Sequence, residues 1–186
     1  MSIKINQAEY GRPQDLTGRL PREVRTYEFL DRLGIEYLRA DHEPAETMED
    51  CAEIDKVISP AVMCKNLFLC NTQKTAFYLL MIRADKKFKT KEISHQIGSA
   101  RLSFAPGEFM EQFLDISPGA LSVLGLMNDS ENSVRLLVDE DLLKSEYIGC
   151  HPCVNTSSLR LKTADIFGKF LEETGHDYTK VALGYE

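Results

Sequence analysis

The pattern of apolar and polar positions first predicts a β-hairpin in the middle of the chain. Residues 65–70 and 75–82 are rich in Leu, Phe, Tyr and Ile, and four polar residues (Asn-Thr-Gln-Lys) separate the two runs. Two apolar runs joined by so short a polar loop are typical of adjacent antiparallel strands. We therefore expect these residues to form the centre of a sheet.

Helical spacing predicts several helices around this hairpin. In residues 21–33, Pro21 suits the first turn, apolar residues recur every three positions, and Gly34 suits a left-handed C-terminal cap. Thr47 precedes a Met and two acidic residues, which indicates the capped start of a second helix. Further helices are predicted over residues 89–97, 106–113 and 164–174, with a helical turn over 139–144.

The remaining apolar runs predict short strands interspersed with these helices, and several are joined by loops too short for a parallel crossover. A length of 186 residues suits one domain. The fold class predicted is therefore α+β, a single domain with a mixed, largely antiparallel sheet surrounded by helices. The additional strands are expected at residues 35–40, 101–104, 134–138, 147–149, 157–161 and 180–183.

Composition narrows the classes of function. With 43% hydrophobic and 27% charged residues the chain is typical of a globular protein, and no apolar run is long enough to cross a membrane. The first residues show no signal-peptide pattern, so a cytoplasmic location is expected. Five cysteines, an odd number, favour free thiols in a reducing compartment over a disulfide framework.

Charge argues against non-specific coating of nucleic acid, because the formal net charge is −7. Six basic residues nevertheless gather between positions 83 and 101. Such a group is usually a solvated face, and it becomes informative only if the substrate is a nucleic acid. No Gly-rich phosphate-binding loop follows a predicted strand, which argues against nucleotide-hydrolysing and dinucleotide-binding folds. The basic residues are Arg83, Lys86, Lys87, Lys89, Lys91 and Arg101.

The segment Gly149-Cys150-His151-Pro152-Cys153 holds the most reactive residue types in the chain. Its C-x-x-C spacing suits a thiol-disulfide centre, but that motif normally opens a helix, and here strand and turn residues follow. A zinc site would need two more ligands at a suitable spacing. Two incidental cysteines beside a functional loop remain the simplest interpretation, and the sequence leaves all three open.

The same segment also suits a rigid loop whose backbone N–H groups stabilise an oxyanion, although its composition alone favours a plain structural turn. His151 is a candidate for acid–base chemistry or for a structural role. Lys65 begins an apolar strand, where it either marks a solvated end or projects into a cleft toward phosphate or carbonyl oxygens. Asn66 and Asn128 are compatible with turns and, secondarily, with ligand binding.

These segments, in this order, resemble the YbaK/prolyl-tRNA editing family, whose members hydrolyse amino acids wrongly attached to tRNA. The resemblance covers the chain from the first helix to Thr174, so residues 1–20 are an N-terminal extension and residues 21–186 an editing domain. The segments that carry it are His42-Glu43-Pro44-Ala45, Lys65-Asn66-Leu67-Phe68-Leu69, Arg101-Leu102-Ser103-Phe104, Ser117-Pro118-Gly119, Asn128-Asp129, and residues 149–156 (Gly-Cys-His-Pro-Cys-Val-Asn-Thr).

The resemblance implies a barrel-like sheet, no metal, no cofactor, and a cytoplasmic deacylase acting on tRNA(Pro) charged with alanine, with prolyl-tRNA synthetase as a candidate partner. It implies catalytic roles for Lys65, Gly149 and His151. Deacylation of Cys-tRNA, or an editing-like module that binds without turnover, remain the alternatives. Residues implied to bind substrate are Asn66, Ser103, Asn128, Cys150 and Pro152.

Overall fold

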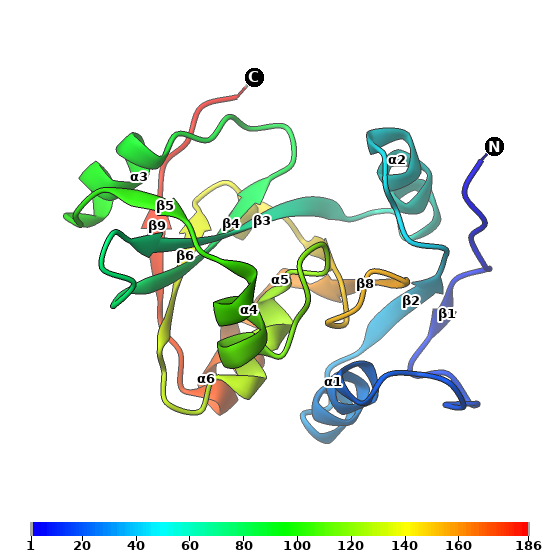
Figure 1. Ribbon diagram of the computed structural model, residues 1–186. Coiled ribbons are helices and arrows are strands. Elements are labelled where there is room, and N and C mark those ends of the chain that lie inside the picture. The colour runs from blue at the N-terminus through cyan, green and yellow to red at the C-terminus, as the bar shows by residue number, and fades with distance from the viewer. Residues whose placement is uncertain (1, 186) are drawn as a thin grey trace.

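The computed structural model describes residues 2–185, and within them one mixed sheet of nine strands organises the fold (Figure 1). The strand order is β1-β2-β8-β7-β3-β4-β6-β9, with β5 paired to β3 beside that path. The strands are β1 (Glu9–Tyr10), β2 (Tyr37–Asp41), β3 (Val62–Asn71), β4 (Phe77–Arg83), β5 (Leu102–Phe104), β6 (Val134–Asp139), β7 (Tyr147–Cys150), β8 (Ser157–Lys162) and β9 (Tyr178–Val181).

The ten-residue strand β3 connects the two halves of this sheet. Its first residues pair in parallel with β7, whereas its later residues pair antiparallel with β4 and β5. Figure 1 shows β3 running between the half that holds β1, β2 and β8 and the half that holds β4, β6 and β9. Residues of β3 are therefore fixed by neighbours from distant parts of the chain.

Helices cover both faces of the sheet and are short. Thr47 caps the start of its helix, as its sequence predicts, and the structure adds a capping box with Asp50. The helix expected over residues 164–174 is present, but its middle, Ile166–Phe170, is a π-helical segment. The α-helices are α1 (Pro21–Arg32), α2 (Met48–Val57), α3 (Thr90–Ile97), α4 (Gly107–Leu114), α5 (Thr163–Asp165) and α6 (Leu171–Thr174), and 3₁₀ turns occupy Val123–Asn128 and Leu142–Lys144.

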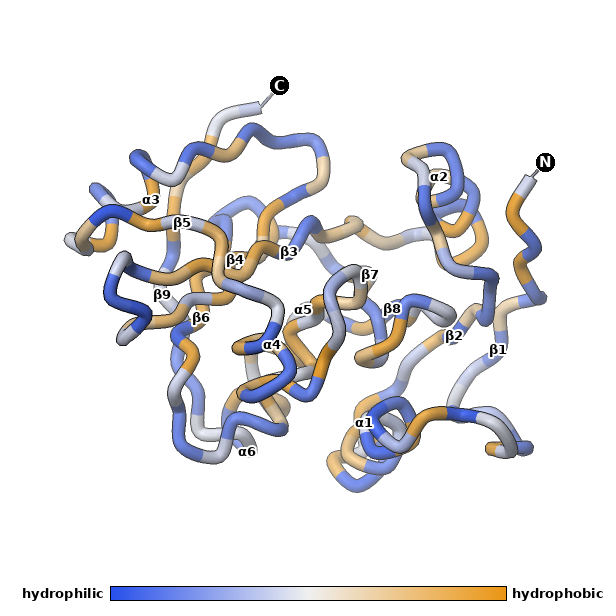
Figure 2. Tube along the Cα trace, viewed as in Figure 1, coloured by the Kyte–Doolittle hydropathy of each residue, from blue (hydrophilic) through white to orange (hydrophobic). Residues whose placement is uncertain are grey.

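The core has a larger part and a smaller part on opposite faces of the sheet. The larger cluster includes Phe68 and Leu79, and the smaller one includes Leu69 and Leu80, so neighbouring residues of β3 and β4 enter different clusters. Side chains alternate between the faces of a strand, and Figure 2 shows the resulting runs of hydrophobic residues along these strands. Because both faces are covered, almost every residue of β4 is buried.

The predicted fold class is confirmed, including the central hairpin, which is formed by β3 and β4. Antiparallel pairs outnumber parallel ones, and the parallel pairs are β3–β7, β4–β6 and β6–β9. The last strand is displaced from its expected position and covers Tyr178–Val181. Residues of the N-terminal extension add β1 to the edge of the sheet beside β2. No helix within residues 2–185 is long and apolar enough to cross a membrane.

Candidate functional site

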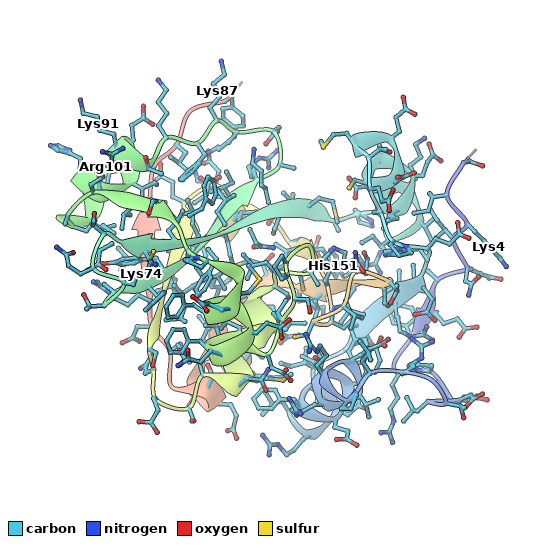
Figure 3. The ribbon with its side chains drawn as sticks, viewed as in Figure 1. Lys4, Lys74, Lys87, Lys91, Arg101 and His151 are labelled. Atoms are coloured by element: carbon cyan, nitrogen blue, oxygen red, sulfur yellow. The ribbon has the colours of Figure 1, made fainter. Side chains whose placement is uncertain are left out.

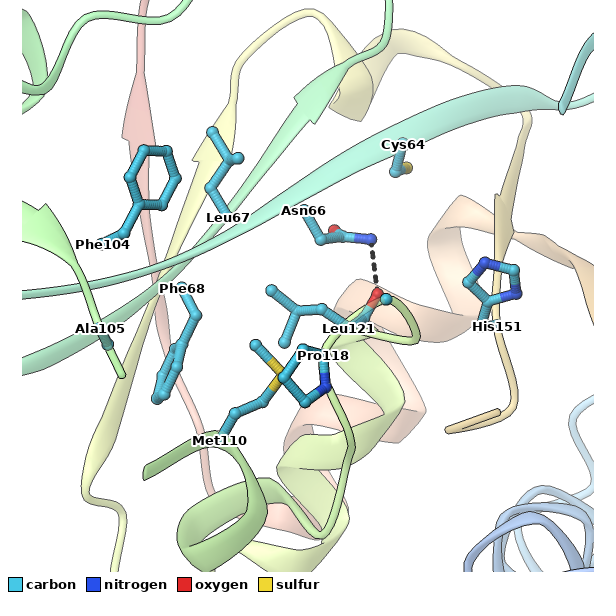
Figure 4. A pocket seen from close by; sticks show the side chains of 11 residues that line it. Cys64, Asn66, Leu67, Phe68, Phe104, Ala105, Met110, Pro118, Leu121 and His151 are labelled. Atoms are coloured by element: carbon cyan, nitrogen blue, oxygen red, sulfur yellow. Dashed lines mark hydrogen bonds between the residues drawn. The ribbon is translucent and has the colours of Figure 1, made fainter. Parts of the chain in front are cut away.

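A cavity of about 320 Å³ lies on one face of β3 and is the candidate site (Figure 4). Its floor comes from β3, and its walls come from the end of β5, from α4, from the loop over residues 118–121 and from the loop that follows β7. The lining residues are Cys64, Asn66, Leu67, Phe68, Phe104, Ala105, Met110, Pro118, Gly119, Leu121 and His151.

Asn66 is the polar side chain in the floor of this cavity. Its Nδ2 donates a hydrogen bond of 3.1 Å to the Leu121 carbonyl oxygen, drawn as a dashed line in Figure 4. Since a carbonyl oxygen only accepts, this bond fixes which way the amide points. The Asn66 Oδ1 is buried and has no hydrogen-bond partner among residues 2–185. A buried polar atom without a partner is rare in folded proteins and costs about 1–3 kcal/mol.

His151 presents a neutral imidazole to the other end of the cavity. Its Nδ1 lies 2.8 Å from the Ser157 carbonyl oxygen and must donate to it, which leaves Nε2 as an acceptor in the neutral ring. Burial lowers the pKa of His151, and the nearby His42, with ring centroids 6.2 Å apart, lowers it further. The hydrogen bond to Ser157 only partly opposes this. His151 is therefore suited to accept a proton or hydrogen bond from a ligand.

Cys150, the last residue of β7, and Pro152 and Cys153, in the loop that follows, are buried and do not line the cavity. Burial raises the pKa of Cys150 and of Cys153 to about 12, so both are protonated thiols at neutral pH and poor nucleophiles. Burial also raises the pKa of Cys64, the thiol that lines the cavity. All five cysteines are free, and residues 2–185 contain no group of three side chains suited to hold a metal ion.

Gly149 is an interior residue of β7, where it pairs with Met63 of β3 and with Arg160 of β8. A Cβ atom added to Gly149 would overlap the Met63 sulfur and would lie 3.3 Å from Ile58 Cδ1. The close approach of Met63 is therefore sufficient to explain a glycine here. The expected loop begins two residues later, at His151.

Lys65 lies next to Asn66 in β3 and so faces the other side of the sheet. Its Nζ donates a hydrogen bond of 3.2 Å to the backbone carbonyl of Lys86. The structure thus does not bring Lys65 to the cavity that Asn66 and His151 line. Lys86 itself is fully buried, with its Nζ 2.7 Å from Asp139 and 2.6 Å from Asp141. The expectation that Lys86 contributes to a solvated basic face is wrong, because these two carboxylates neutralise it inside the protein.

Ser103 and Asn128, the other two residues expected to bind substrate, also lie outside the cavity lining. Ser103 is exposed on β5, opposite Cys70. Asn128 instead holds neighbouring elements together: its Nδ2 donates to the Leu114 carbonyl at 2.9 Å, and its Oδ1 accepts from Arg25 at 3.2 Å. Its contacts are those of a structural residue.

The apolar wall of the cavity is the part that sequence patterns missed. Phe104, Met110 and Leu121 come from three different elements, so no local spacing connects them. Pro118 and Gly119, from one of the segments that carry the family resemblance, do line the cavity. The combination of an apolar wall with two acceptor-bearing polar side chains suits a small ligand that has a short apolar group and hydrogen-bond donors.

The fold and this site define the class, an α+β protein with a small-ligand cavity over the central strand of a mixed sheet. Residues 42–168 match the sequence model of the aminoacyl-tRNA editing domain, about two thirds of the chain. The chain therefore belongs to the aminoacyl-tRNA editing domain family. This confirms the family expected from the sequence, and with it the enzyme class, aminoacyl-tRNA hydrolases.

Individual relatives extend this match over most of the chain. The prolyl-tRNA editing protein ProX of Acetoanaerobium sticklandii is 30% identical over 83% of this chain and 93% of its own. The prolyl-tRNA synthetase associated domain-containing protein 1 of Danio rerio is 32% identical over 86% of this chain and 85% of its own. A crystal structure described as a candidate trans-editing enzyme for prolyl tRNA synthetase shares the fold, with a TM-score of 0.64, 14% identity, and coverage of 90% of this chain and 99% of its own.

Proposed function

We propose that this protein is a trans-editing deacylase that hydrolyses the ester bond of Ala-tRNA(Pro). The observation that carries the proposal is the family match over residues 42–168 together with a cavity that offers both an apolar wall and polar acceptors. Prolyl-tRNA is the object of editing in the name of the bacterial relative, which is aligned over 93% of its length. This supports tRNA(Pro) as the nucleic acid.

The amino acid is proposed to be alanine because a site for proline cannot strongly reject a smaller side chain. Each missing methylene changes binding by only about 1–3 kcal/mol, so a synthetase needs a second site that admits the smaller product and excludes proline. In this protein Met110 and Leu121 of the apolar wall, together with Phe68 of the floor, offer a surface against which a methyl group can pack. Beside that wall, Asn66 and His151 supply acceptors for the α-amino group of an aminoacyl ester.

Hydrolysis of such an ester requires little from the protein, because the ester is already activated. In the proposed mechanism a water molecule attacks the carbonyl carbon, and the bond to the ribose oxygen breaks as that oxygen takes up a proton. Nε2 of neutral His151 holds the water or the amino group in position, and the neighbouring ribose hydroxyl of the tRNA assists the proton transfer. A nucleophilic thiol is not needed.

Lys65 and Gly149 are proposed to have different roles, and different observations support each role. Lys65 is half-buried, and its contact with the Lys86 carbonyl uses one of three N–H donors, leaving two for phosphate or ribose oxygens of the tRNA 3′ end. It would act from the opposite face of β3. Gly149 is proposed to shape the site by letting β7 approach Met63.

The first test measures deacylation of Ala-tRNA(Pro), Cys-tRNA(Pro) and Pro-tRNA(Pro) in parallel. Rapid loss of alanine alone supports the proposal. Preferential release of cysteine would show that Cys-tRNA(Pro), rather than Ala-tRNA(Pro), is the substrate. Tight binding without hydrolysis of any of the three would identify a non-catalytic binding module. Because burial lowers the pKa of His151, we expect activity to persist below the usual histidine pKa and then to fall as His151 becomes protonated.

We further propose a cytoplasmic location and an association with prolyl-tRNA synthetase, which would deliver mischarged tRNA directly. The support is that the Danio rerio relative is named as containing a prolyl-tRNA synthetase associated domain. Gel filtration of this protein with prolyl-tRNA synthetase, with and without tRNA(Pro), tests the association: co-elution supports it, and separate elution under both conditions excludes a stable complex.

A further inference from the structure

Phe104 is an exposed aromatic side chain at one end of the cavity. It is 62% exposed, although it contributes to the cavity lining. Figure 4 shows Phe104 and His151 at opposite ends of the site, with Asn66 between them. Single exposed apolar side chains are common on protein surfaces, so exposure alone proves nothing. What distinguishes Phe104 is its position beside a cavity suited to an aminoacyl ester.

The backbone of Phe104 is fixed by strand pairing, and its ring is fixed by a contact with another aromatic ring. Phe104 pairs with Leu69 in the sheet, and the next amide, that of Ala105, donates a hydrogen bond of 2.8 Å to the Phe68 carbonyl. The Phe104 ring meets Phe88 edge to face, with ring centroids 6.0 Å apart and an interplanar angle of 61°. A side chain already fixed in this way loses little conformational entropy when a ligand packs on it.

Three exposed cationic side chains lie in the same half of the molecule as Phe104. Lys87 lies in the loop between β4 and α3, Lys91 lies in the first turn of α3, and Arg101 directly precedes β5 (Figure 3). Within the part of the chain that the structure describes, none of the three has a carboxylate oxygen within 4.0 Å. In a protein with a net charge of −7, such a group is a local exception that suits phosphates.

We propose that Phe104 stacks on the base of the 3′-terminal adenosine of the tRNA, and that Lys87, Lys91 and Arg101 bind the phosphates of its single-stranded 3′ end. This inference rests on the proposed function. In an aminoacyl-tRNA the ester-bearing ribose joins the amino acid to that base. When the amino acid lies beside Asn66 and His151, the base therefore extends toward the opposite end of the cavity, where Phe104 lies.

An aromatic platform flanked by cations is a common means of binding single-stranded nucleic acid, because every base has a π-face and every nucleotide a phosphate. The arrangement explains how an acidic protein can hold the end of a tRNA without a large basic surface. It also separates two tasks: Phe104 and the cations determine affinity for the tRNA end, and the opposite half of the cavity determines which amino acid is removed.

The test compares the wild-type protein with Phe104→Ala, Phe104→Trp and the control Tyr10→Ala, which removes an equally exposed aromatic on β1. For Ala-tRNA(Pro) we measure KM and kcat. For uncharged tRNA(Pro), with and without its terminal adenosine, we measure Kd. Thermal melting establishes that each variant is folded.

We expect Phe104→Ala to raise KM, and Kd for intact tRNA, by about 5- to 150-fold with kcat nearly unchanged. Phe104→Trp should restore both values, and Tyr10→Ala should leave them unchanged. On tRNA without the terminal adenosine, wild type and Phe104→Ala should bind equally. Unchanged KM and Kd in Phe104→Ala would overturn the inference, as would an equal loss of affinity on the shortened tRNA.

Salt dependence tests the cations. Arg101→Gln should reduce the slope of log Kd against log salt by about 0.7, the value for one phosphate contact on a single strand, whereas Lys4→Gln, on the far side of the molecule (Figure 3), should not. An unchanged slope in Arg101→Gln would exclude Arg101 from the phosphate contacts. If the wild-type protein hydrolyses no aminoacyl-tRNA, the proposed function fails, but the binding measurements on uncharged tRNA still decide whether Phe104 stacks on its terminal base.

Discussion

Replacing Gly149 with alanine tests whether this glycine serves packing or catalysis. Gly149 is buried in β7, and a Cβ there would overlap the Met63 sulfur and lie 3.1 Å from Met63 Cε and 3.3 Å from Ile58 Cδ1. Overpacking of this kind typically costs about 1–3 kcal/mol. For a domain of this size each kcal/mol shifts the melting temperature by about 2–4 °C. We therefore expect Gly149→Ala to melt roughly 2–12 °C below the wild-type protein.

A double-mutant cycle with Met63→Ala isolates the cause. Met63 is only half-buried, so Met63→Ala alone should cost less than the 2–5 kcal/mol typical of a fully buried methionine. In the double variant the overlap is gone, and the alanine at position 149 should be tolerated. We expect a coupling free energy of about 1–3 kcal/mol between the two positions, measured by urea denaturation.

Deacylation by the same variants, measured well below their melting temperatures, completes the experiment. If packing is the reason for the glycine, the double variant should be as stable as Met63→Ala alone and should recover turnover. Wild-type stability in Gly149→Ala would refute the packing argument outright. A double variant that regains stability but not turnover would show that the Gly149 backbone acts directly on the substrate.

Three further predictions follow from individual side chains. Lys65→Ala should lower turnover of aminoacyl-tRNA while changing the melting temperature little, because Lys65 makes a single hydrogen bond, to the Lys86 carbonyl; normal turnover would remove Lys65 from the mechanism. Burial raises the pKa of Asp55 to about 6, so its ionisation costs stability as the pH rises from about 4 to 6. Asp55→Asn should therefore stabilise the protein by about 1 kcal/mol at pH 7, a figure set below the full pKa shift because the side chain is partly exposed. The variant should also lose the fall in stability between pH 4 and pH 6. Urea denaturation at pH 4 and pH 7 measures both effects, and a pH dependence equal to that of the wild-type protein would contradict the prediction. The double variant Cys150→Ser/Cys153→Ser should melt at a lower temperature than the wild-type protein, because two hydroxyls replace buried thiols. With reductant present it should still deacylate aminoacyl-tRNA at the wild-type rate. A folded but inactive double variant would show that the thiols take part in the chemistry.

Local sequence signals predicted the elements of the fold well, because each depends on residues close together in the chain. The cap at Thr47 and Pro21 in the first turn of α1 are chemical signals of this kind. The parallel pairing of β3 with β7 is different, since it joins residues more than eighty positions apart. Nothing in either strand alone specifies that partner. The same holds for β1, whose two residues form a strand only because β2 is beside them.

The site was harder to predict for two physical reasons. The first is strand geometry: Lys65 and Asn66 are adjacent in β3, so their side chains point to opposite faces of the strand, and this could have been inferred from the strand prediction itself. The second is that a charge can be neutralised by partners distant in the sequence. Lys86 looks like part of a solvated basic group in the sequence, but its partners Asp139 and Asp141 lie more than fifty residues away and become neighbours only in the folded protein.

The floor and the walls of the cavity differ in how many other elements hold them in place. Its floor is β3, the strand paired with three others, whereas its walls are single loops, one short helix and the end of the short edge strand β5. A substitution in the floor is therefore transmitted to both halves of the sheet, but a substitution at Met110, Pro118 or Leu121 affects mainly one wall. Relatives that edit different amino acids can diverge at low cost in the walls while keeping the same floor. Amino-acid preference within the family should accordingly evolve faster in the α4 segment and the loop that follows it than along β3.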